Sequence, residues 1–167
     1  INKFQEITFI KNMKKLIHLI QFIFIKIIFF IFQIIGYKFS SNLGFLIGRF
    51  IGPIFKSKKS IIENLQTAKI RHKLNYNKIA TNVLGNYGRI FAEYIHLKHF
   101  RNDKLKKFIS IDGYHHLENI KKSKKKVVFI SGHFNNFELM AMQIEKIGID
   151  VAAIYRPLNN PYLNKTM

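Results

Sequence analysis

Residues 16–35 (LIHLIQFIFIKIIFFIFQII) form an almost unbroken apolar run, which limits most strongly what the chain can fold into. At about 1.5 Å per residue, a helix of this run is about 30 Å long and matches the hydrocarbon core of a bilayer. We therefore predict a membrane helix over residues 16–36, preceded by a basic lead-in at residues 1–15.

The few polar residues of this run leave its placement open. Lys26 lies near the middle, where a lysine costs about 2.5–3.5 kcal/mol on insertion scales. His18, Gln21, Lys26 and Gln33 fall within an arc of roughly 140° on the helix. The helix either crosses the bilayer with this side against protein, or lies in the interface plane. A signal peptide is a third alternative, although the run is long for one and no small-residue cleavage site follows it.

Basic residues are more numerous on the C-terminal side of the run than in the lead-in. If the helix spans, the positive-inside rule places the rest of the chain in the cytoplasm. The basic residues concerned are Lys38, Arg49, Lys56, Lys58 and Lys59.

Residues 37–108 are predicted to form a helical segment. An apolar stripe at helical spacing favours a helix over residues 75–96, and capping and turn residues bound two others. The first of these is expected to end at Gly52-Pro53. The predicted helices cover residues 40–54, 60–70 and 75–96. A lysine-rich link at 100–110, a short strand and turn at 109–113 and a short helix at 116–122 follow.

Residues 127–155 have the pattern of a strand, a helix and a second strand. Residues 127–130 (VVFI) and 151–155 (VAAIY) are short, apolar, β-rich runs, and Ser131-Gly132 ends the first. Asn135 and Asn136 are good N-caps for a helix that Gly148 would end. This order indicates a βαβ unit, so we predict an α/β fold. Residues 109–167 are expected to form the N-terminal part of its sheet domain, which is incomplete in this chain.

His133 and Glu138 are the candidate catalytic pair. Residues five apart on one helix point about 140° away from each other, so His133 must lie on the turn before the helix if the two are to meet. Histidine is suited to take a proton near neutral pH, and a carboxylate on its second nitrogen would fix its tautomer. The alternative is a surface histidine and a glutamate favoured by the helix dipole.

The chain is strongly basic, with 28 Lys and Arg against 9 Asp and Glu and a formal net charge of +19. Such an excess favours anionic partners, although a lysine-rich genome would also produce it. The absence of cysteine excludes disulfides, a thiolate metal site and a cysteine nucleophile. Nothing resembles a groove-reading helix or an RNA platform, so we expect no nucleic-acid partner.

Several segments, in order, resemble the lipid A late (lauroyl/myristoyl) acyltransferases. Residues 132–139 (GHFNNFEL) resemble the family's GHFGNWEL, and residues 155–161 (YRPLNNP) its YRPLxNP. Asn135 replaces the usual glycine and Phe137 the usual tryptophan. Weaker similarities precede them at residues 46–52, 64–65, 93–94 and 111–117.

This resemblance implies a glycerol-phosphate-acyltransferase-like α/β sheet domain and O-acylation at the inner membrane, with the catalytic part facing the cytoplasm. The donor would be an acyl group on acyl carrier protein, and the acceptor a hydroxyl of an anionic lipid A precursor. His133 would be the general base and Glu138 its orienting acid, with Arg156 and Asn136 binding substrate. No metal or cofactor is expected.

Two rival functions stay open: acyl transfer to another glycolipid or phospholipid, and membrane binding by a basic protein without catalysis. Because the chain starts at Ile1 and stops soon after Pro161, we expect a fragment cut at least at the C-terminus. Half a sheet exposes strand edges and apolar surface, so the isolated fragment should be poorly soluble and inactive.

Overall fold

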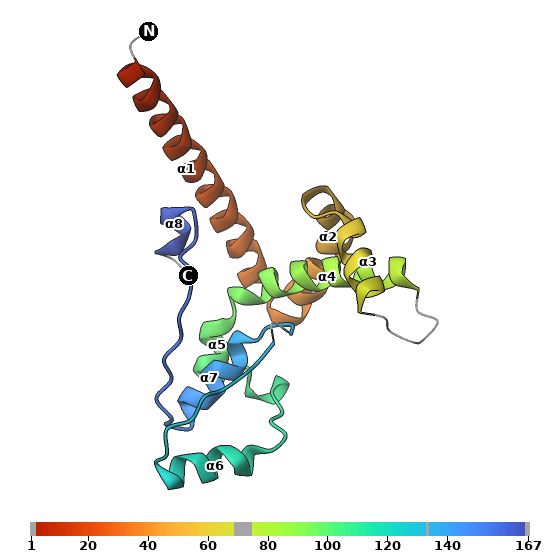
Figure 1. Cartoon of the computed structure of the whole chain (residues 1–167), viewed down its shortest axis with the longest axis vertical. Coiled ribbons are helices and arrows are strands. Elements are labelled where there is room, and N and C mark those ends of the chain that lie inside the picture. Colours follow the sequence, from red (N-terminus) through yellow and green to blue (C-terminus); the bar gives the residue numbers. More distant parts are fainter. Residues whose placement is uncertain (1–2, 69–74, 133, 166–167) are drawn as a thin grey trace. The chain divides into compact units, whose positions relative to one another are not determined.

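A computed structural model describes residues 3–68, 75–132 and 134–165, with side chains from residue 5 onward. The chain divides into two compact units. One contains the residues up to Ile34 together with those from Ala152 onward, and the other is Ile35–Val151. Figure 1 shows the elements of both units.

Helix α1 (Lys3–Ile35) continues without a break through the basic lead-in and the apolar run. Within the part of the chain that the structure describes, it is the one helix long and apolar enough to cross a membrane by length and composition. The candidate span is Gln5–Ile35, and an 18-residue window within it has a mean hydropathy of 2.2. This helix supports the predicted membrane segment.

The C-terminal segment of the same unit packs on the polar side of α1. Asn160 caps the short helix α8 (Pro161–Asn164) through its side-chain oxygen. Its side-chain nitrogen donates to the carbonyl of His18 at 2.8 Å and to Gln21 Oε1 at 3.2 Å. The polar side chain of Gln21 therefore has a partner from within the chain, which offsets its cost in an apolar helix.

The second unit is built on the contact between α2 (Tyr37–Phe55) and α4 (Tyr76–Tyr94), with α3 (Lys58–Thr67) beside α4. Gly44 and Gly48 are one turn apart on α2 and face Gly88 on α4, where the two backbones touch. A Cβ added at Gly88 would lie 2.7 Å from Gly48 Cα. Small residues at such spacing let helices approach more closely than larger side chains allow.

The remaining helices follow α4 directly. They are α5 (Leu97–Arg101), the 3₁₀ turn η1 (Lys106–Phe108), α6 (Tyr114–Ser123) and α7 (Glu138–Lys146). Helix α7 packs against α5 and buries Met142 and Ile144. Gly148, at φ 87°, ends α7 as predicted, and its N–H donates to the carbonyl of Glu145.

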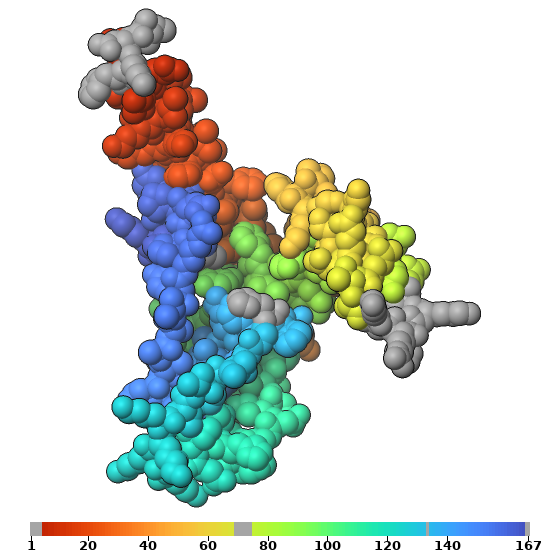
Figure 2. Space-filling model, in the orientation of Figure 1, coloured from red at the N-terminus to blue at the C-terminus, as the bar shows by residue number. Residues whose placement is uncertain are grey.

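The predicted α/β fold is wrong for the described residues, which contain no strand. Residues 127–130 and 151–155 are not part of any helix, but neither run is paired in a sheet. Val128 is 88% exposed and Ile130 94% exposed. In Figure 1 the chain between α6 and α7 has no arrow, and in Figure 2 it runs along the surface. A β-branched run favours extended backbone, but a strand exists only where a second edge takes its hydrogen bonds.

Three local predictions also need correction. Residues 109–113 form a turn without a strand. Helix α2 runs past Gly52-Pro53 to Phe55, because a proline removes only one donor and the N–H of Lys56 still reaches the carbonyl of Gly52. Neither Asn135 nor Asn136 caps α7: the capping residue is Phe137, and Asn135 has a left-handed φ of 46°.

The glycine contact gives a direct test of the second unit. We expect Gly88→Ala to destabilise the chain by about 1–3 kcal/mol, because the new methyl overlaps the α2 backbone. The unfolding midpoint of helical circular dichroism in detergent measures this effect. Asn82→Ala, at an exposed position of α4, is the matched control and should not lower the midpoint. A midpoint unchanged by Gly88→Ala would contradict the close contact.

Candidate functional site

The C-terminal end of α4 directs two neighbouring side chains to different parts of the second unit. Glu93 is buried, at 7% exposure, and faces α2. Its Oε1 accepts a hydrogen bond from Ser41 Oγ at 2.7 Å and a longer one from the Tyr37 hydroxyl at 3.5 Å. Burial and the negative charge of Glu93 raise the pKa of Tyr37 above its ordinary value. The acid is thus held by two hydroxyl groups from one turn of α2.

A second buried contact joins Ser40 to His96, just beyond α4. Ser40 Oγ donates to the carbonyl of Tyr37 at 2.9 Å and lies 2.9 Å from His96 Nε2. His96 precedes Leu97, the first residue of α5, so this contact links α2 to the start of α5.

Tyr94, the residue after Glu93, reaches the first turn of α7 and donates a hydrogen bond to Glu138. Burial, the negative charge of Glu138 and this hydrogen bond raise the pKa of Tyr94 to about 12. The phenol therefore stays protonated at neutral pH and acts only as a donor to the carboxylate. Glu138 itself lies in the first turn of α7, as the sequence predicts.

The turn before α7 holds the other motif residues. The N–H of Phe134 donates to the carbonyl of Gly132 at 2.9 Å, and Phe134 is 82% exposed. The side-chain nitrogen and oxygen of Asn136 are both buried, and neither has a hydrogen-bond partner among the described residues. His133, the predicted base, lies outside the described residues, so its distance to Glu138 stays a prediction.

Arg156, the other predicted substrate-binding residue, is exposed and belongs to the unit that contains α1. The structure thus brings Glu138 and Asn136 into one unit at the start of α7. That Arg156 joins them stays a prediction.

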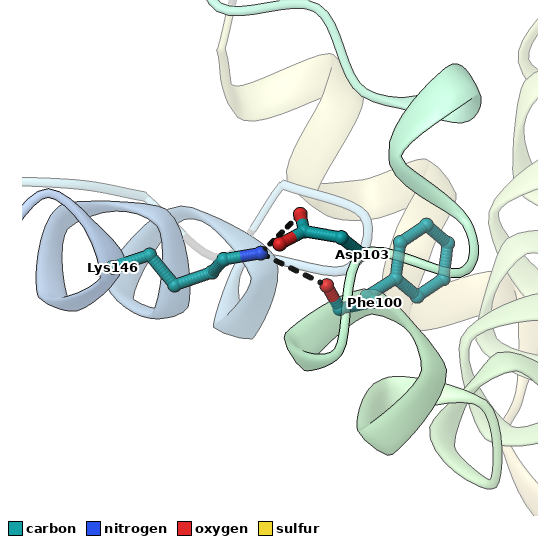
Figure 3. A network of polar contacts seen from close by, with 3 residues as sticks. All are labelled: Phe100, Asp103 and Lys146. Carbon is teal, nitrogen blue, oxygen red and sulfur yellow. Dashed lines mark hydrogen bonds and ion pairs between the residues drawn. The ribbon is translucent and has the colours of Figure 1, made fainter.

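The far end of α7 is fixed to the segment that follows α4. Lys146 Nζ pairs with Asp103 Oδ1 at 2.5 Å and donates to the carbonyl of Phe100 at 3.3 Å (Figure 3). The hydrogen bond from Lys146 lowers the pKa of Asp103. Arg101 pairs with Glu145 at 3.0 Å. Lys146 therefore holds the far end of this short helix, whereas the half-exposed Arg101–Glu145 pair contributes little.

Sequence reasoning missed most of the residues that hold this arrangement. Residues 93–94 were noted only for their resemblance to a family segment, and no role was assigned to Tyr37, Ser40, Ser41 or His96. One signal was available: Glu93 is an acidic residue within an apolar stripe of a strongly basic chain. A carboxylate in such a position requires partners when it is buried.

No group of three or more potential metal ligands lies together in the described part of the chain. The arrangement at the start of α7 is instead an oriented carboxylate beside a glycine-containing turn. Those groups are suited to holding an imidazole and a polar substrate group.

Comparison with known proteins identifies the class. The sequence model of the bacterial lipid A biosynthesis acyltransferases matches residues 7–167. The chain belongs to this family, as the sequence resemblance predicts. No curated protein and no solved structure matches the chain. The family together with the apolar helix α1 indicates an acyltransferase that associates with membranes.

The contact between Tyr94 and Glu138 predicts a pH effect. In Glu138→Gln, the pKa of Tyr94 should fall from about 12, because the negative charge is lost while burial remains. The pKa of Tyr94 in the folded chain lies above its ordinary value of 10. The stability that this contact contributes is therefore present below pH 10 and lost as the pH rises toward 12. Tyrosinate absorbance, taken as the difference from Tyr94→Phe, measures the pKa.

Glu145→Gln is the matched control, because it makes the same charge change on α7 but faces Arg101. It should leave the pKa of Tyr94 unchanged. Equal titration of Tyr94 in both variants would rule out the contact.

Proposed function

We propose that the chain carries an acyltransferase site that moves a fatty acyl group from acyl carrier protein to a hydroxyl of a lipid A precursor. His133 is the general base, Glu138 orients it, and Asn136 and Arg156 bind substrate. The observation that carries the proposal is the family match over residues 7–167, which includes the segment around His133 and Glu138.

The reaction needs one proton acceptor and one oriented imidazole. His133 takes the proton of the acceptor hydroxyl while the oxygen attacks the thioester carbonyl carbon. The new C–O ester bond forms, the C–S bond breaks, and the leaving thiolate takes the proton from the imidazolium. Glu138 accepts a hydrogen bond from the second ring nitrogen and stabilises the imidazolium by its charge.

The surroundings of Glu138 support this role. Tyr94 is a neutral donor to the carboxylate of Glu138, and a carboxylate can accept further hydrogen bonds. An imidazole at the end of the preceding turn is therefore a compatible second partner. A cation in place of the phenol would weaken the charge that the imidazolium needs.

The buried amide of Asn136 is suited to bind a polar group of the substrate near the same turn. Leaving a buried polar group without a partner costs about 1–3 kcal/mol, so a ligand that bonds to this amide would recover that cost. The guanidinium of Arg156 is suited to a phosphate of the acceptor lipid. The excess of positive charge, +19 over the chain, suits both an anionic lipid and an acidic carrier protein.

The proposed location is the inner membrane, with the catalytic residues on the cytoplasmic side. Helix α1 anchors the chain, and the basic residues that follow it favour the cytoplasmic face by the positive-inside rule. Acyl carrier protein reaches the site from that side.

Transfer assays with His133→Ala, Glu138→Gln and Glu145→Gln test the proposed roles. They use the 167-residue chain and acyl carrier protein loaded with a labelled acyl group. His133→Ala should lower transfer at least about 100-fold, because a positioned base contributes about 10²–10⁴-fold. Glu138→Gln should lower kcat more than it raises KM, and Glu145→Gln should retain activity.

Membrane association must stay intact in each variant, as checked by flotation with vesicles. Full transfer by His133→Ala in the active form of the protein would refute the assignment of the base. Loss of membrane association together with transfer in Glu138→Gln would indicate a structural role instead.

A further inference from the structure

Helix α2 presents an uncovered apolar face on the side opposite its glycines. Phe39 is 75% exposed, Phe50 74% and Ile54 80%. At about 100° per residue, seven of the eight exposed large apolar residues of α2 share one arc of about 140°, and the eighth, Phe55, lies about 40° outside it. The seven are Phe39, Leu43, Leu46, Ile47, Phe50, Ile51 and Ile54. Gly44 and Gly48 of the contact with α4, together with the buried Ser41, lie outside this arc, whereas the buried Ser40 falls near its edge beside Ile51.

The charges of this region are all of one sign. Between Tyr37 and Ile62 the sequence has five basic residues and no acidic one. Lys38 and Arg49, both exposed, fall within about 20° of each other on one flank of the apolar arc. The remaining three, Lys56, Lys58 and Lys59, follow directly after the helix. An anionic surface that also accepts apolar side chains would match this helix.

The position of α2 in the chain fits the same partner. Gly36 alone separates the end of α1 from the start of α2. Two residues span at most about 7 Å, so the first turn of α2 stays close to the end of the apolar helix. Where α1 enters a bilayer, α2 therefore begins at the bilayer surface.

We infer that α2 lies in the plane of the membrane interface and is a second membrane contact, with its apolar arc among the acyl chains and its basic flank against anionic headgroups. This is the geometry of interfacial amphipathic helices, whose long basic side chains extend to the headgroups. It places α4, which packs on the glycine side of α2, away from the acyl chains. The inference concerns membrane contact alone and does not require that the chain transfers acyl groups.

The absence of cysteine allows labels at single positions. Phe39→Cys, Phe50→Cys and Ile54→Cys each carry an environment-sensitive fluorophore on the exposed arc of the full chain. Gln66→Cys, exposed on α3, is the control. The chain is reconstituted in vesicles of phosphatidylcholine with or without phosphatidylglycerol. Iodide in the water and brominated acyl chains in the lipid then serve as quenchers.

In vesicles containing phosphatidylglycerol, all three arc labels should be quenched by brominated lipid at similar depth and protected from iodide. The label at position 66 should be quenched by iodide alone. Arg49→Gln should lower the ratio of membrane-embedded to water-exposed arc labels about fivefold. This factor corresponds to about 1 kcal/mol per basic residue at an anionic surface. Lys122→Gln makes the same charge change at an exposed site of α6 and should have no effect. Circular dichroism confirms that each variant keeps its helices.

Three results would overturn the inference. Arc labels protected from iodide but not quenched by brominated lipid would mean that protein covers the face, either α1 or a second copy. Quenching by iodide alone would mean that the face stays in water. Depths that increase steadily from position 39 to position 54 would mean that α2 crosses the bilayer.

Discussion

The backbone contact between Gly44 and Gly48 on α2 and Gly88 on α4 is the constraint on which the second unit depends. It holds the two helices close enough for short hydroxyl side chains of α2 to reach Glu93 and His96. A larger side chain at any of these glycines would separate the helices, and the buried acid would lose its donors. The hydrogen bonds of Ser40 and Ser41 therefore require glycine, which has no side chain, one or two turns further along α2.

The same contact affects two parts of the second unit, the start of α7 and the apolar face of α2. On one side, the end of α4 presents Tyr94 to Glu138, so the position of the proposed catalytic acid follows from the packing of α2 on α4. On the other side, the glycine face of α2 leaves its apolar face uncovered. Helix packing thus connects the proposed catalytic turn with the proposed membrane contact. The ion pair at Lys146 completes the connection by holding the far end of α7.

The helices were largely predictable from sequence, because their signals are local: an apolar stripe identified α4, and Gly148 the end of α7. The sheet was not, since a β-branched run such as residues 127–130 indicates extended backbone but not the partner that would complete a strand. The site was predictable only in part. Motif similarity located Glu138, whereas the Tyr94 contact depends on a pairing of distant elements that no spacing rule reveals. The position of His133 relative to Glu138 stays a prediction.

The choice of tyrosine beside Glu138 has a physical basis in a chain with 28 basic residues. An acid that orients a histidine must keep its negative charge available to the imidazolium as it forms. A lysine or arginine at position 94 would hold the carboxylate equally well, but would compete for that charge. A phenol whose pKa is raised to about 12 fixes one side of the carboxylate without neutralising it. Tyr94 would thus limit the freedom of Glu138 while preserving the property that the proposed reaction requires.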